Sequence, residues 1–268
     1  MLGKLLKYDF KANFKYFLPM SIFMLLYSCL GTLLFRIDGN TQFSSNGLIE
    51  VLTVFAIIAF VIMIIGYIIV TQGIIVVNFY KSMVTDTGYL THTLPVSKIA
   101  LLASKLISGA AIVLLSYVVS VISTLIMFDI PANALKYREL IMEVMKAAAY
   151  KEVLGSLPLF ILSFTFALLA STIFSLSMYF MCIAFGQLMS HHKVIGSFVS
   201  YFVIQFIIQI LCTILTYLSG GYLSKINDSM IYHFMSSFFF GISGFTLLLS
   251  AGMIAITHYV FKRKLNLD

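Results

Sequence analysis

The sequence predicts an all-α, polytopic membrane protein with six transmembrane helices. Its 268 residues are 61% hydrophobic and only 10% charged, whereas soluble domains are about 45–50% apolar and about 25% charged. The charges are also bunched, and they leave six long uncharged stretches. The shortest, Tyr16–Phe35, has 20 residues, which is enough for a helix to cross a hydrocarbon core of roughly 30 Å. Barrel strands are not expected, because apolar residues do not alternate with polar ones in these stretches.

The predicted spans belong to a single transmembrane domain that covers residues 1–268. They occupy residues 17–35, 51–80, 106–128, 153–190, 194–224 and 229–261. The remaining segments are too short for a second soluble domain. The fourth stretch is the longest, and its residues 159–185 contain no Gly, Pro, Asn or Asp. Because a hairpin needs such turn residues, we expect one long helix there rather than two spans.

Residues 1–15 form an amphipathic pattern before the first span. Four lysines fall within about 80° of one another on a helical wheel: Lys4, Lys7, Lys11 and Lys15. Leucine and phenylalanine residues lie opposite them, which is typical of a helix that lies in the membrane interface. We expect this interfacial helix to end before Pro19. Asp9 and Asn13 interrupt its apolar face, and they favour a protein neighbour there over lipid.

The basic residues are distributed unevenly between the two predicted faces of the membrane. One face carries Lys4, Lys7, Lys11, Lys15, Lys81, Lys98, Lys105, Lys193, Lys262, Arg263 and Lys264. The other carries Arg36, Lys136, Arg138, Lys146, Lys151 and Lys225. Because cytoplasmic loops are rich in lysine and arginine, both termini are predicted to be cytoplasmic. The net charge of +7 then reflects topology and attraction to an anionic lipid bilayer, and a nucleic-acid partner is not expected.

Neutral polar residues form stripes on the second and fifth spans. The positions are Tyr67, Thr71 and Asn78 on the second, and Gln205, Gln209, Thr213 and Thr216 on the fifth. Two interpretations stay open. These side chains can line a hydrated translocation path, or they can form hydrogen bonds between helices, which contribute about 0.6 kcal/mol each.

The sequence argues against an enzyme. No Asp, Glu, Lys or Arg lies within the uncharged stretches, and no serine or cysteine there has a base and an orienting acid in its pattern. Cofactor and metal sites are not expected either, and a carrier coupled to an ion gradient is disfavoured because it needs ionisable groups at depth. No G-x-x-x-x-G-K-[ST] phosphate loop is present, so any ATP hydrolysis would belong to a partner subunit.

The loop between the second and third spans, residues 81–105, is the most informative segment. Its run Gly88-Tyr89-Leu90-Thr91-His92-Thr93-Leu94-Pro95-Val96-Ser97-Lys98, followed by Ser104-Lys105-Leu106, resembles the corresponding loop of bacterial type-2 ABC transporter permeases. The layout is similar too, with a basic interfacial helix, six spans and a short basic tail. The resemblance implies a cytoplasmic coupling helix that docks on a separate ATPase subunit through Asp86, Gly88, Tyr89, Leu90, His92, Leu94, Pro95, Val96 and Lys98.

The resemblance implies a permease subunit of an ATP-driven ABC exporter in the bacterial cytoplasmic membrane. Such a subunit would pair with a second permease, identical or related, and with ABC ATPase subunits. Many Phe, Tyr and Met residues (25, 15 and 14) supply adaptable apolar surface, which favours an amphipathic peptide or another hydrophobic substrate. Two alternatives stay open: a membrane scaffold or assembly subunit that transports nothing, and an ion-coupled carrier.

Overall fold

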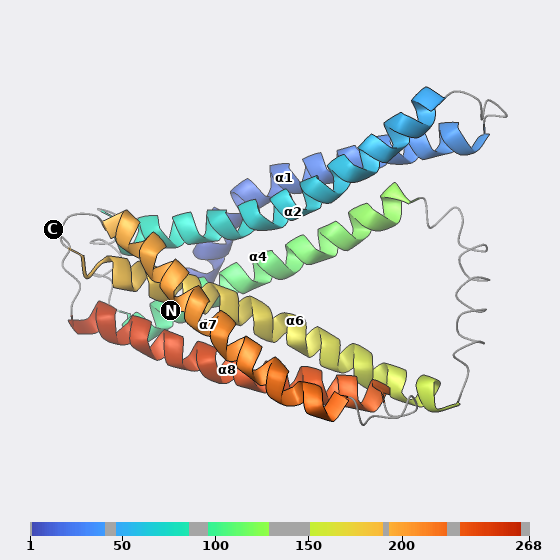
Figure 1. The fold of residues 1–268 in the computed structure, drawn as a ribbon. Coiled ribbons are helices and arrows are strands. Elements are labelled where there is room, and N and C mark those ends of the chain that lie inside the picture. Colours follow the sequence, from blue (N-terminus) through green and yellow to red (C-terminus); the bar gives the residue numbers. More distant parts are fainter. Residues whose placement is uncertain are drawn as a thin grey trace. The chain divides into compact units, whose positions relative to one another are not determined.

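The computed structural model describes residues 2–40, 47–85, 96–128, 151–189, 193–223 and 231–263. These residues form helices and contain no strand (Figure 1). The helices are α1 (Leu2–Asn40), α2 (Gly47–Met83), α4 (Lys98–Met127), α6 (Lys151–Gly186), α7 (Lys193–Leu223) and α8 (Ile231–Arg263).

Each helix is long and apolar enough to cross a membrane, which confirms the all-α polytopic architecture. The fourth predicted span is a single helix, as expected, although α6 ends at Gly186. The third begins earlier than residue 106, because α4 starts at Lys98. Of the predicted coupling segment, residues 86–95 lie outside the described residues.

The amino-terminal segment differs from the prediction in one respect. Residues 1–15 were expected to form a helix distinct from the first span, but α1 continues through Pro19 to Asn40. A proline removes one backbone hydrogen bond, yet spanning helices tolerate it where neighbouring helices compensate. Asn13, predicted to favour a protein neighbour, is only 5% exposed.

The chain divides into two compact units. Unit 1 contains residues 1–2, 78–106 and 148–268, and unit 2 contains residues 3–77 and 107–147. Helices α2 and α4 therefore each contribute to both units, and the chain passes from one to the other at positions 77/78 and 106/107.

In unit 2, α1 packs against α2 through a buried stripe on each helix. The phenyl ring of Phe60 stacks on Tyr27 with centroids 6.3 Å apart, and Phe17 lies 6.4 Å from Tyr67. Phe60 also joins Met24 and Met127 in a buried cluster. The two helices run side by side in Figure 1, and their contacts place the start of α2 beside the end of α1.

The end of α4 joins this pair. The Thr32 hydroxyl donates a hydrogen bond to the Ile126 carbonyl oxygen at 2.6 Å. The Met127 side chain covers Gly31 so closely that a Cβ there would overlap its sulfur. Glycine thus permits the close approach of helices that is typical of membrane interfaces.

In unit 1, α6 and α8 run parallel and α7 runs antiparallel to both (Figure 1). Near the start of α6, the Phe160 and Phe164 rings each lie 5.8 Å from the Phe239 ring of α8. Further along, Met178, Met181 and Cys182 of α6 form a buried cluster with Met253 of α8. The parallel contact therefore extends over much of both helices.

The junction between α6 and α7 depends on two glycines. A Cβ at Gly186 would lie 2.6 Å from the Lys193 carbonyl oxygen and 2.7 Å from the Ser197 nitrogen, too close for any real side chain. A Cβ at Gly196 would lie 3.3 Å from the Gly186 Cα. The end of α6 therefore meets the first turn of α7 directly.

Candidate coupling site

The predicted ATPase-coupling residues are only partly within the described structure. Seven of them lie outside the described residues: Asp86, Gly88, Tyr89, Leu90, His92, Leu94 and Pro95. Val96 and Lys98 are described, and they lead into α4. Ser97 starts this helix as an N-cap, because its hydroxyl accepts a hydrogen bond from the Ala100 N–H at 3.3 Å.

Lys98 connects the start of α4 to the end of α8. Its Nζ donates a hydrogen bond to the Phe261 carbonyl oxygen at 2.8 Å. This carbonyl is one of the last four of α8, which have no partner within the helix. A cation is disfavoured in the first turn of α4 but favoured at the carboxyl end of α8 by the helix dipole. The ammonium group that sequence reasoning assigned to an ATPase contact is thus bonded within the chain.

An aromatic cluster joins the end of α2 to α6 and to the end of α8. The Phe79 ring stacks on Phe180 of α6 with centroids 3.8 Å apart and an interplanar angle of 8°, and it lies edge-on to Phe261 at 6.2 Å. All three rings are almost fully buried, and so is Met83, the last residue of α2. Beyond the area they bury, such ring pairs contribute about 0.5–1.5 kcal/mol each.

The two helix ends that flank residues 86–95 are therefore fastened to one body. We call the set Phe79, Phe180, Phe261 and Lys98 the clamp. All four residues belong to unit 1, and Phe261 takes part through both its ring and its carbonyl group. A force applied to residues 86–95 would consequently act on α6 and α8 first.

Two of the three polar stripe residues of α2, Tyr67 and Thr71, lie in unit 2. The Tyr67 hydroxyl is 2.8 Å from the Ser21 hydroxyl of α1, and the Thr71 hydroxyl donates to the Tyr67 carbonyl oxygen at 2.7 Å. Tyr67 is 5% and Thr71 is 2% exposed. Of the two open interpretations, hydrogen bonding between helices describes Tyr67, whereas the Thr71 hydroxyl is satisfied within α2 itself. Asn78, the third, is partly buried and lies in unit 1.

The polar stripe of α7 is different, because its side chains are exposed. Gln205, Gln209 and Thr213 all lie on the surface of the described structure. Thr213 bonds back to the Gln209 carbonyl oxygen at 2.8 Å; Thr216 is helical, but its side chain lies outside the described part. The predicted path residues therefore divide into buried positions on α2 and exposed positions on α7.

Sequence reasoning missed the clamp, although one signal was present. Phe79 continues the four-residue spacing of Tyr67, Thr71 and Ile75 along α2, and all four are buried. That spacing marks a helix face that packs on protein. Phe261 likewise continues the four-residue spacing of the buried Met253 and Thr257 along α8, but no spacing indicates its partner Lys98, 163 residues away.

In comparisons with known proteins, no family model, no curated protein and no solved structure matches the chain.

Proposed function

We propose that this chain is the membrane-spanning permease subunit of an ATP-driven exporter. It pairs with a second permease, identical or related, and is driven by separate ATPase subunits that dock on residues 86–95. Its cargo is an amphipathic peptide or another hydrophobic molecule, and its termini face the cytoplasm of a bacterial cell.

The clamp is the observation that carries the proposal. A docking segment transmits force only if the helices that flank it are fixed to the parts that must move. Here Phe79 fixes the end of α2, and Lys98 fixes the start of α4, to α6 and α8. The loop-motif resemblance supplies the identity of the docked partner.

The surface of α7 supports the second part of the proposal. Gln205 and Gln209 are exposed on a helix that is otherwise largely apolar. An amide side chain in contact with lipid leaves its hydrogen-bonding groups unsatisfied, which is costly. We assign this stripe to a hydrated path at the junction with the second permease, and we leave the buried stripe of α2 out of the path.

One observation favours a second candidate function, a scaffold subunit that transports nothing. Thr71 is buried and hydrogen-bonded, as a scaffold requires of all its polar side chains. The exposed Gln205 distinguishes the two functions, because a scaffold would also keep that residue away from water.

Purification with an ATPase tests the proposal. The tagged chain is expressed with an ATPase subunit encoded beside it, and complex formation and ATP turnover are measured in nanodiscs. We expect Tyr89→Ala, Leu94→Ala and Pro95→Ala to weaken both. The control is Leu188→Ala, an exposed residue just after α6, on the same predicted membrane face.

The outcomes separate the candidates. Loss of complex in the three variants, with Leu188→Ala unchanged, supports the coupling assignment. Full complex and full turnover in all three variants would show that residues 86–95 do not dock, and a scaffold would then be the better description.

A further inference from the structure

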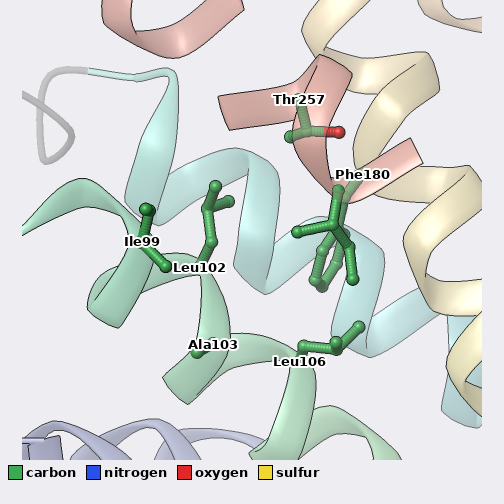
Figure 2. Close-up of a pocket in the computed structure, with 7 residues that line it drawn as sticks. Ile99, Leu102, Ala103, Leu106, Phe180 and Thr257 are labelled. Carbon is green, nitrogen blue, oxygen red and sulfur yellow. The ribbon is translucent and has the colours of Figure 1, made fainter. Parts of the chain in front are cut away.

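An apolar cavity lies in unit 1 beside the clamp. Its volume is about 90 Å³, and its walls come from three helices. They are Ile99, Leu102, Ala103 and Leu106 of α4, Phe180 of α6, and Ile254 and Thr257 of α8. Figure 2 shows the α4 side chains on one side of the cavity, with Phe180 and Thr257 opposite them.

The walls offer almost nothing to a polar occupant. Thr257 has the only polar side chain among them, and its hydroxyl donates to the Met253 carbonyl oxygen at 2.8 Å. A buried water needs two to four polar partners, and apolar cavities of similar size stay dry. The cavity therefore suits an apolar group, and its volume admits only a short part of a longer chain.

Positive charge lies next to this apolar cavity. Lys98 precedes Ile99 and lies about one helical turn before Leu102, and its ammonium bonds to Phe261, which lies about one turn after Thr257. Lys262 follows Phe261 and is exposed. Neither α4 nor α8 contains an acidic residue, so Lys98 and Lys262 have no acidic neighbour on their own helices.

Anionic phospholipids of the bilayer combine an apolar acyl chain with an adjacent negative charge. We propose that the cavity binds part of one acyl chain of an anionic phospholipid, whose phosphate lies against Lys98 and Lys262. A zwitterionic lipid offers the same chain but no net charge. The site does not depend on the proposed export function, because it requires only that the helices lie in a bilayer.

The position of the lipid gives it a role in the clamp. Phe180 is shared between the cavity wall and the ring stack with Phe79, and Lys98, which bonds to Phe261, directly precedes the lining residue Ile99. A bound chain would fill the space between α4 and α8, so anionic lipid should stabilise unit 1.

Lipid retention tests this site in the full chain. The protein is reconstituted in nanodiscs that contain equal amounts of phosphatidylglycerol and phosphatidylcholine. It is then released from the nanodiscs, and the lipids that remain bound to it are counted by native mass spectrometry. We expect the wild type to retain phosphatidylglycerol over phosphatidylcholine by about fivefold for each of the two lysines, and so by about 25-fold in all.

Two variants remove the two halves of the site. Ala103→Phe fills the cavity and should bring the retention ratio close to one. Lys262→Gln removes one of the two charges and should lower the ratio about fivefold. Ala251→Phe makes the same change at an exposed position of α8, and Lys262→Arg keeps the charge, so both controls should behave as the wild type.

The outcomes decide the proposal. Equal retention of both lipids by the wild type overturns it, and so does a preference that a folded Ala103→Phe variant keeps. If Ala103→Phe does not fold by circular dichroism, the comparison of Lys262→Gln with Lys262→Arg decides alone: equal ratios overturn the proposal, and a loss restricted to Lys262→Gln supports it.

Discussion

The ring of Phe79, four residues before the end of α2, lies face to face with Phe180 of α6 at a centroid distance of 3.8 Å. The two residues are 101 positions apart in the chain, yet both are almost fully buried. This contact and the bond between Lys98 and Phe261 fasten both flanks of residues 86–95 to unit 1. Each half of the clamp can be tested separately.

Removal of the Phe79 ring should destabilise the chain. Phe79→Ala leaves a cavity against Phe180 and Phe261, and such truncations cost about 3–5 kcal/mol in protein cores. The matched control is Phe55→Ala on the same helix, because Phe55 is 65% exposed. Melting temperatures in detergent should fall clearly for Phe79→Ala and little for Phe55→Ala; equal decreases would show that the stack contributes nothing specific.

The charge of Lys98 should matter as much as its shape. Lys98→Met leaves the Phe261 carbonyl without its charged donor, a loss of about 1.5–3 kcal/mol for a hydrogen bond to a charged group, whereas Lys98→Arg can retain the bond. We expect the melting temperature to drop for Lys98→Met and to recover in Lys98→Arg. If Lys98→Met is as stable as the wild type, the hydrogen bond from Lys98 to α8 does not contribute to stability.

The contact between the Ser21 hydroxyl of α1 and the Tyr67 hydroxyl of α2 predicts that substitutions at these two residues are energetically coupled. Ser21 donates to the Phe17 carbonyl oxygen at 2.9 Å, and because a serine hydroxyl has one hydrogen, Tyr67 is the donor in the 2.8 Å contact with Ser21. Tyr67→Phe should cost about 0.6 kcal/mol, and at most about 1.7. In a double-mutant cycle with Ser21→Ala, the two losses should not add; strict additivity would mean that the contact is energetically silent.

The junction of α6 and α7 should not accept even one methyl group. Gly186→Ala places a Cβ against the backbone of Lys193 and Ser197, and overpacking of this kind costs about 1–3 kcal/mol. Gly252→Ala is the control, since nothing lies within 4 Å of a Cβ there. Thermal unfolding should show a loss for Gly186→Ala only; a Gly186→Ala variant as stable as Gly252→Ala would contradict the close approach.

The sequence was sufficient for the architecture because hydrophobic length decides whether a helix spans a membrane. It was insufficient for the inward faces, because the spans are apolar on every side and their periodicity is weak. Tyr67 illustrates this: its contacts with Ser21 and Phe17 show that it packs against α1, and no spacing in the sequence specifies that neighbour. Pro19 is the opposite case, because a residue that often ends a helix lies within α1.

The candidate site was predictable only in part. The motif at residues 86–98 follows the end of α2 and reaches the first residue of α4, and its coupling role stays a prediction. The role of Lys98 could not be predicted, because a bond from a side chain to a distant carbonyl group leaves no local pattern. The exposure of Gln205 and Gln209 likewise depends on how α7 packs against α6, which no local spacing specifies.

Labelling of position 205 with a membrane-impermeant thiol reagent tests the central claim most directly. Gln205→Cys is prepared in a chain that lacks Cys29, Cys182 and Cys212. Phe206→Cys is the control for a lipid-facing position, because the neighbouring Phe206 is 68% exposed on the same helix. The complex with its ATPase is labelled with and without ATP and vanadate. The account predicts that labelling of Gln205→Cys changes with ATP, that Leu94→Ala abolishes the change, and that Phe206→Cys stays unlabelled. Labelling at position 205 that is identical with and without ATP in a functional complex would contradict it.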